Sequence, residues 1–384
     1  MRVAKPTTNE QQPVSRSLRR ERRRWDDADQ HSLALGCLGC HDRPMCGGQH
    51  KKQNHYSCID DCCNNPDKCD SVCPRNMLGF IERMREINGF DYANVESAAP
   101  CASPADVSSY VPMIFHGNRR EKNLDMDTVA VPLHKLYSRR DGSLRYKTPA
   151  DLAAVFRVRK GARIIAIGSG RDKPIEAWWG LSAARKNVIA GLRDLGVVMV
   201  TSPNYSVFTD QPRYDDMYNQ KRILVAWQEF LAGKMPSSLH LNARTIHDYK
   251  RIAEFIDIRD EVSDVSFEFK TGAAWRGRRD FHYQHLAEVG RGSVRPLRLT
   301  MVGGISALPV LVPHYRGGVI YIDTTAFMGT LHRQRLFEGN DGKISKVPEL
   351  TATGAPLDDL FIRNIEVMRR RVERIISESR PEAA

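Results

Sequence analysis

The sequence predicts an α/β fold: a (β/α)8 TIM-barrel-like domain preceded by a small cysteine-rich module that binds metal. Three observations lead to this prediction. Short apolar runs alternate with segments of helical apolar spacing through roughly 220 residues, a length that suits eight strand–helix units. Several of these runs carry polar side chains at every second position. Eight of the nine cysteines lie within residues 37–73.

The N-terminal 30 residues are polar and basic and show no hydrophobic periodicity, which predicts a disordered tail. They include the run SRSLRRERRRW at Ser15–Trp25, which either stays solvated or contacts phosphate groups. The whole chain has a formal net charge of +12 and an isoelectric point near 9.3. This balance favours polyanionic partners, with nucleic acid first.

The length of 384 residues allows one large domain and a smaller module. The sequence contains no apolar run long enough to cross a bilayer and no recognisable signal peptide, so we expect a cytoplasmic protein that does not bind membranes. Thiols stay reduced in the cytoplasm. The nine cysteines are therefore expected to bind metal rather than to form disulfides.

The predicted metal-binding module spans residues 31–97. Its cysteines form closely spaced groups, which suit thiolates that converge on one ion from a turn. We expect zinc, in two four-coordinate sites or in one site with spare thiols. An iron–sulfur cluster, which thiolates also hold, and a disulfide-stapled module are the alternatives. The candidate ligands are Cys37, Cys40, Cys46, Cys58, Cys62, Cys63, Cys69 and Cys73.

A helix at Met77–Ile87 is expected to lead out of this module, and residues 98–110 are expected to form a linker in which Cys101 is incidental. The barrel domain then spans residues 111–384. Its strands are expected at Val111–His116, Thr128–Leu133, Arg163–Gly168, Val197–Thr201, Ser237–Asn242, Val265–Lys270, Leu297–Val302 and Val319–Asp323. Its helices are expected at Pro149–Phe156, Pro174–Leu195, Arg213–Leu231, Thr245–Ile256 and Phe281–Val289.

Two further segments follow the last predicted strand. Gly329–Thr353 is polar and is expected to form a loop. Leu357–Ile376 has the apolar spacing of an amphipathic helix that packs on the body of the domain. Its opposite face is rich in arginine and is expected to be solvated, with contact to phosphate groups as the alternative.

Polar side chains alternate with apolar ones in three of the predicted strands. In Ser237–Ala243, Leu239 and Leu241 point to one side of the strand, and the opposite side carries Ser238, His240 and Asn242. Val265–Lys270 and Leu297–Met301 alternate in the same way. Buried parallel strands are normally apolar on both faces, so the polar face is expected to line a site. A doubly wound open sheet, the alternative fold, would not keep such a face.

Active sites of (β/α)8 barrels lie where the carboxyl ends of the strands meet their loops. Burial of an inward carboxylate there costs free energy unless the group takes part in the reaction or forms an ion pair. The alternative to a catalytic role for Glu268 is therefore a structural ion pair with Lys270 or Arg298. His240 is either an acid, base or hydrogen-bond donor, or a structural histidine. The candidate catalytic residues are Asp323, Glu268, His240 and Asp210. The candidate substrate-binding residues are Asn204, Asn242, Arg244, Lys270, Gly303 and Gly304.

The glycine pair belongs to the turn Val302–Ser306. This turn either opens a helix N-terminus that favours a phosphate or is simply tight. Arg171, Arg213 and Arg244 are candidates for phosphate binding because guanidinium groups match phosphate oxygens in pairs.

Two stretches resemble known families. LTMVGGISALP at Leu299–Pro309 resembles the glycine-pair strand and turn of the tRNA-guanine transglycosylase superfamily. These are metal-containing (β/α)8 enzymes that exchange a base in nucleic acid, with relatives that place deazaguanines in DNA. SPNYSVFTDQPRYDDMYNQKR at Ser202–Arg222 is similar to a family of uncharacterised bacterial, plasmid and phage barrel proteins. The zinc site of the transglycosylases lies near their C-terminus, whereas the cysteines here precede the barrel.

The first resemblance implies that Gly303 and Gly304 contact the base or a phosphate. It also implies that Asp323 or Glu268 attacks the anomeric carbon of the sugar while a second acidic group transfers a proton. A transglycosylase-like enzyme that acts on nucleic acid or a nucleotide is therefore the first functional hypothesis. The alternatives are a non-catalytic zinc-dependent DNA- or RNA-binding protein and an iron–sulfur redox enzyme.

Overall fold

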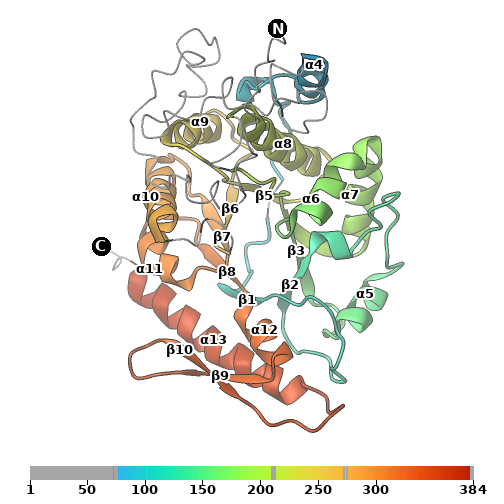
Figure 1. Cartoon of the computed structure of the whole chain (residues 1–384), viewed down its shortest axis with the longest axis vertical. Helices are drawn as coiled ribbons and strands as arrows, with labels where there is room; N and C mark the ends of the chain where they lie inside the picture. The colour runs from blue at the N-terminus through green and yellow to red at the C-terminus, as the bar shows by residue number, and fades with distance from the viewer. Residues whose placement is uncertain are drawn as a thin grey trace, which may run out of the picture.

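The computed structural model of the chain describes residues 72, 77–101, 103–208, 213–270, 273 and 276–380 (Figure 1). The N-terminal tail, the eight candidate cysteine ligands and Asp210 lie outside these ranges, so the predictions made for them stay predictions. Cys101, which does lie within them, is a partly buried free thiol.

Eight parallel strands form a nearly closed barrel with helices around its outside (Figure 1). The strands are β1 (Tyr110–Pro112), β2 (Thr128–Pro132), β3 (Arg163–Ile167), β4 (Val197–Thr201), β5 (Ser237–His240), β6 (Asp264–Glu268), β7 (Arg298–Val302) and β8 (Val319–Asp323). They pair in the order β1-β8-β7-β6-β5-β4-β3-β2. A parallel bridge between Met113 and Ala130 joins the two ends of this series, β1 and β2. The barrel prediction is confirmed, and the open doubly wound sheet is not formed.

Helices connect or follow the strands. They are α5 (Pro149–Phe156), α6 (Asp172–Gly180), α7 (Arg185–Asp194), α8 (Arg213–Ala232), α9 (Ile246–Asp257), α10 (Arg276–Gly292), α11 (Leu308–Leu311), α12 (Thr325–Leu331) and α13 (Asp358–Ser379). The single helix predicted at Pro174–Leu195 is wrong in one respect, because it is two helices, α6 and α7. The chain leaves α6 at Gly180 and passes through a 3-10 turn at Ser182–Ala184, where Ser182 has a left-handed φ of 45°.

The loop predicted at Gly329–Thr353 is also wrong in part. It contains the end of α12 and an antiparallel hairpin of β9 (Gln334–Glu338) and β10 (Ile344–Pro348). The hairpin was missed because its side chains are mostly exposed or half-buried, with Leu336 alone buried, so it lacks the apolar alternation of a core strand. It packs on α13, and the Leu336 amide donates to the side-chain oxygen of Asn364 at 2.8 Å.

Five strands, β1, β2, β3, β5 and β6, end earlier than predicted, and in β5 and β6 this places predicted site residues at the mouth of the barrel. β5 ends at His240 rather than Asn242, and β6 ends at Glu268 rather than Lys270. The paired register with the following strand ends at His240 in β5 and at Glu268 in β6, and one further backbone hydrogen bond, from Leu241 and from Phe269, follows each end. Asn242 and Lys270 therefore belong to loops, which are freer than strands to adapt to a ligand.

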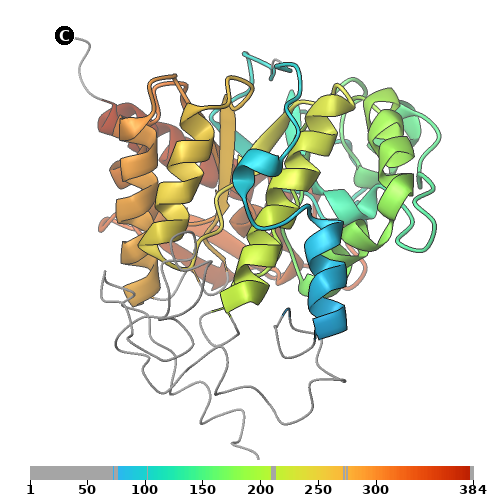
Figure 2. The ribbon, with the colours of Figure 1, turned by 90° about the horizontal axis from the view of Figure 1, so that it is seen from above.

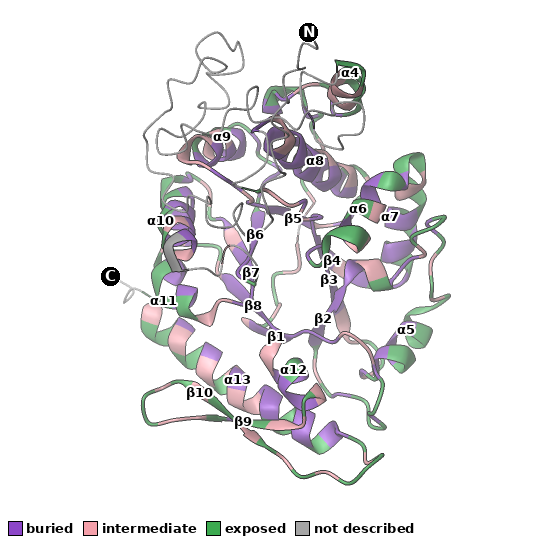
Figure 3. Ribbon diagram, viewed as in Figure 1, coloured by how far each residue is buried: buried purple, intermediate pink, exposed green. Residues whose placement is uncertain are grey.

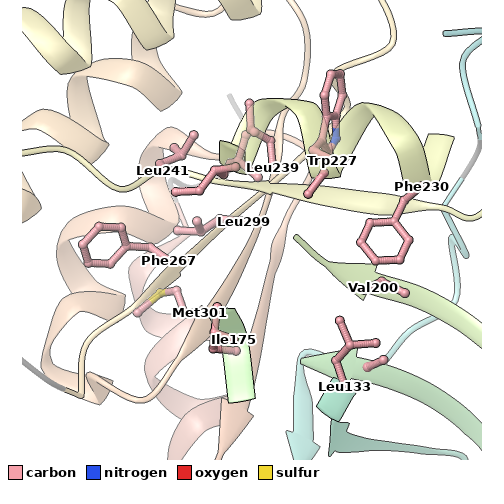
Figure 4. Close-up of a cluster of buried hydrophobic side chains, with 14 of the residues drawn as sticks. Leu133, Ile175, Val200, Trp227, Phe230, Leu239, Leu241, Phe267, Leu299 and Met301 are labelled. Carbon is pink, nitrogen blue, oxygen red and sulfur yellow. The ribbon is translucent and has the colours of Figure 1, made fainter. Parts of the chain in front are cut away.

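Apolar side chains form two layers, one outside the barrel wall and one within it. The barrel strands are buried along most of their length, as the purple ribbon of Figure 3 shows. Leu239 and Leu241 belong to the outer layer with Trp227 of α8, as Figure 4 shows. The inner layer comes from strands other than β5 and β6 and comprises Val111, Met113, Ala130, Ile165, Ile167, Met199, Val302, Ile320 and Ile322. The side of β5 and β6 that faces the interior is instead polar, as the alternation of the sequence predicts.

Segments on both sides of the barrel sequence pack against its helices. Helix α4 (Met77–Glu86) lies beside α8 (Figure 2), where the rings of Phe80 and Tyr214 meet edge to face at 5.6 Å. Glu86 of α4 accepts a hydrogen bond from the indole of Trp179 at 2.5 Å. At the other end of the chain, α13 packs on α11 and α12. The barrel helices are thus covered by residues that precede and follow them.

Candidate active site

A cavity of about 530 Å³ opens at the carboxyl ends of the barrel strands. Its volume lies in the range of small-molecule sites, roughly 300–1,000 Å³. The loops after β3, β4, β5 and β6 supply most of its wall, and α10 completes it. Six of the candidate catalytic and substrate-binding residues line the cavity: Asn204, His240, Asn242, Arg244, Glu268 and Lys270.

Glu268 is the most buried carboxylate of the cavity wall. It ends β6 and is 8% exposed, and its Oε2 accepts a hydrogen bond from Asn204 Nδ2 at 3.5 Å. Burial raises the pKa of this carboxyl, while the charge of Lys270 and the polar groups of Asn204 and Ser169 lower it. Opposed influences of this kind occur at groups that change charge during a reaction.

An amide pair orients the partner of Glu268. Asn242 Nδ2 donates to Asn204 Oδ1 at 2.8 Å and to the carbonyl of Tyr205 at 3.0 Å. Because the oxygen of the Asn204 amide accepts this bond, its nitrogen is turned toward Glu268. Gln220 donates to the carbonyl of Asn242 at 3.3 Å and ties the pair to α8.

Lys270 supplies a cation on the same wall, two residues beyond Glu268. Its Nζ lies 5.8 Å from the centre of the Phe115 ring. Removal of the ammonium from bulk water lowers its pKa, and the charges of Glu268 and Asp323 raise it. Lys270 as a residue remains exposed through the mouth of the cavity, so the ammonium is accessible to a ligand.

Two histidines line the cavity as neutral imidazoles. Burial lowers the pKa of His240 to about 3, and its ring stacks on Phe267 with centroids 5.9 Å apart. Burial, helped by the charge of Arg278, also lowers the pKa of His282, whose Nδ1 lies 2.7 Å from the hydroxyl of Tyr249. At pH 7 each neutral ring carries one N–H donor and one acceptor. Nδ1 already meets Tyr249 in His282 and Ser266 Oγ, at 3.5 Å, in His240, so Nε2 is the nitrogen through which each ring would meet the edge of a base.

Arg244 lines the cavity from within a buried ion cluster. Its Nη1 donates to Asp216 at 2.8 Å, and Asp248 accepts from the backbone amide of Arg244 at 2.8 Å. Arg213 pairs with Asp248, and all four side chains are buried. The structure therefore gives Arg213 and Arg244 carboxylate partners at positions where a phosphate had been expected. Arg171, the third phosphate candidate, lies on the rim and is exposed.

The structure places Asp323 away from the cavity wall. Its side chain is 0% exposed and accepts hydrogen bonds from the Tyr110 hydroxyl at 3.0 Å and from the amides of Thr325 and Ala326 at 2.7 and 3.1 Å. These contacts fix the start of α12. They also engage the carboxylate oxygens that an attack on a substrate would require.

Gly303 and Gly304 shape the turn after β7 and do not line the cavity. Both have left-handed backbone conformations, with φ of 71° and 70°. A Cβ at Gly304 would lie 2.4 Å from the Cβ of Phe269, whereas a Cβ at Gly303 would contact the stem of Lys270 at 3.3 Å. These glycines let the turn pass close to the loop that carries Lys270.

Substitution of Gly304 by Ala is therefore expected to lower the free energy of unfolding by about 1–3 kcal/mol, because strain at positive φ adds to the clash with Phe269. Chemical denaturation of the variant and the wild type measures this loss of stability. Gly180→Ala is the matched control, since a Cβ there meets no atom within 4 Å. Equal stability of the Gly304 variant and the wild type would show that the turn relaxes freely.

Several lining residues were not predicted as site residues from the sequence. Arg278 and His282 lie four residues apart on α10 and so share one face of the helix. This spacing can be read from the sequence, but it is equally typical of a solvated helix face, so it did not identify the pair as site residues. Ser169 and Asp172 belong to the loop after β3, which was recognised as polar but contains no pattern that selects them. Phe208 lines the cavity from the loop after β4.

The described part of the chain contains no cluster of three or more His, Cys, Asp or Glu side chains arranged to hold a metal ion. The eight candidate cysteine ligands lie outside that part, so the zinc prediction stays open. None of the described helices is long and apolar enough to cross a membrane.

In comparisons with known proteins, the chain matches neither a protein-family model nor a curated protein.

Proposed function

We propose that this protein is an enzyme that exchanges a base at the anomeric carbon of a nucleotide or of a nucleotide unit in nucleic acid. The observation that carries the proposal is a buried carboxylate, Glu268, on the wall of a cavity of about 530 Å³, with Lys270 beside it. A barrel that served only as a scaffold would fill such inward positions with apolar side chains, because burial of an ionisable group costs free energy.

In the proposed reaction, a carboxylate oxygen of Glu268 attacks the anomeric carbon of the sugar. The carbon–nitrogen bond to the base breaks, and its electron pair leaves with the base. The Lys270 ammonium, whose pKa is lowered by its surroundings, gives a proton to the departing nitrogen. The incoming base then attacks the same carbon, the bond to Glu268 breaks, and the proton of the incoming nitrogen returns to Lys270. Bonds, protons and charge balance over the cycle.

The remaining wall suits the two ends of a nucleotide. Phe115 and Phe208 offer ring faces on which a base can stack, and the neutral rings of His240 and His282 can read its edge. In this proposal the basic tail and the cysteine-rich segment, with zinc bound, hold the polymer when the substrate is nucleic acid.

The experiment is incubation of the full chain with duplex DNA or with tRNA and radiolabelled guanine or 7-deazaguanine. Label is expected to enter the polymer in proportion to time and enzyme, without a new strand break. Absence of label from both polymers and from a nucleoside monophosphate would overturn base exchange. Release of the original base without uptake of the labelled base would replace it by hydrolysis at the same site.

A further inference from the structure

The amino-terminal end of α6 faces the cavity and is not capped by a side chain. The N-cap residue is Arg171, which makes no capping hydrogen bond, and Gly170, Arg171 and Asp172 line the cavity. The backbone N–H groups of Asp172 and Lys173 form no hydrogen bond with a described residue. Free amides and the helix dipole make such an end a site for an anion.

A second feature at this place points independently to a ligand. Ser169, two residues before the N-cap, is 6% exposed and lines the cavity, and its hydroxyl has no hydrogen-bond partner of good geometry among the described residues. Buried hydroxyls are nearly always hydrogen-bonded, since an unpaired one loses its bonds to water without replacement. A ligand oxygen at the start of α6 would supply the missing partner.

The two charged side chains at the start of α6, Arg171 and Asp172, have opposite effects on a bound anion. Arg171 is exposed and forms no ion pair with a described acidic residue, so its guanidinium is available to an anion. Asp172 is the unfavourable neighbour of an anion, but its carboxylate accepts a hydrogen bond from the Ser206 hydroxyl at 2.5 Å. This bond also joins the loop after β4 to the start of α6.

The position of Ser169 links this corner to the proposed chemistry. The Ser169 hydroxyl lies within reach of the Glu268 carboxylate and helps to lower its pKa, although the pair does not have the geometry of a full hydrogen bond. In a nucleotide a single sugar separates the phosphate from the anomeric carbon. A phosphate at the start of α6 would therefore leave the anomeric carbon near Glu268.

We propose that the start of α6, with the Ser169 hydroxyl, the Arg171 guanidinium and the amides of Asp172 and Lys173, is the phosphate subsite of the cavity. The inference rests on the proposed function and narrows it: the substrate carries a phosphate on the reacting sugar, as a nucleoside monophosphate or as a unit of nucleic acid, and a free nucleoside is a poor substrate.

Isothermal titration of the full chain with inorganic phosphate tests the subsite apart from the reaction. Wild-type protein is expected to bind one phosphate, and Ser169→Ala and Arg171→Ala are each expected to weaken binding about tenfold, because each removes a direct bond to a charged ligand. Asp172→Asn is expected to tighten binding, because it removes a like charge. Lys186→Ala, which removes an exposed cation from α7, is the control and is expected to bind as the wild type does.

The outcomes separate this inference from the proposed function. Phosphate binding that is absent, or unchanged in both Ser169→Ala and Arg171→Ala, overturns the subsite even if bases are exchanged. Selective loss of binding supports it even if no base is exchanged. Competition for the same site by a nucleoside 5′-monophosphate and by a short oligonucleotide, compared with the nucleoside alone, tells which phosphate source the site accepts. Equal binding of all three would overturn the phosphate requirement.

Discussion

Replacement of Glu268 by Gln is expected to lower the rate of base exchange by about a thousandfold or more, because the amide can neither attack the anomeric carbon nor leave it with the electron pair. The change keeps the size of the side chain, and the amide can still hydrogen bond to Asn204, which lies 3.5 Å from Glu268. Single-turnover incorporation of labelled base measures the effect. Mass spectrometry of quenched wild-type reactions is expected to show the sugar attached to Glu268.

The matched control is Glu254→Gln, which removes an exposed carboxylate from α9 outside the cavity wall and is expected to keep the wild-type rate. The Glu268→Gln variant is expected to be at least as stable as the wild type. Burial raises the pKa of the Glu268 carboxyl, which means that the charged form is costly at this position and that a neutral amide avoids the cost. Wild-type turnover by Glu268→Gln would remove this residue from the reaction. Asp323 would then be the remaining carboxylate to examine among those predicted within the described residues.

The second large effect is expected at the buried ion cluster. Asp248→Asn is expected to lower the free energy of unfolding by about 3–5 kcal/mol, because it removes the carboxylate that pairs directly with the buried guanidinium of Arg213 and leaves the longer ion pair with Asp216 at 3.9 Å. The same carboxylate caps α9 by accepting from the amide of Thr245 at 2.9 Å. Denaturation with urea measures the loss, and Asp257→Asn, at an exposed position at the end of α9, is the control.

The cluster also predicts how stability depends on pH. Burial alone would raise the pKa of Asp248, but the charge and hydrogen bonds of its partners, Arg213 first, outweigh burial and hold the pKa at about 2, below the ordinary value of 3.8. The ionised carboxylate therefore stabilises the fold fully above pH 3.8, and this contribution is lost as the pH falls toward 2. Asp248→Asn should flatten that part of the stability curve. If stability is instead lost between pH 5 and 8, the pH dependence belongs to groups other than Asp248.

The architecture was predictable because it rests on local patterns. Apolar runs separated by helical spacing require a parallel sheet, and eight such units match a barrel. The alternation of Leu239 and Leu241 with His240 indicated which side of β5 is polar, since successive side chains of a strand point to opposite faces of the sheet. The hairpin of β9 and β10 was not predictable in this way, because most of its side chains are exposed and make no apolar pattern.

The sequence by itself determined the barrel, the polar inner side of β5 and β6, and six candidate catalytic and substrate-binding residues that meet at the cavity. Strand parity places His240 and Glu268, and the other four follow the carboxyl ends of strands, where the loops of a barrel meet. Only the tertiary structure decided what those side chains contact. Glu268 and Asp323 both end strands of the same barrel, yet one faces the cavity and the other caps α12. Arg244 likewise meets Asp216 of α8, 28 residues earlier in the chain. Such partners come together through packing, which no local spacing encodes.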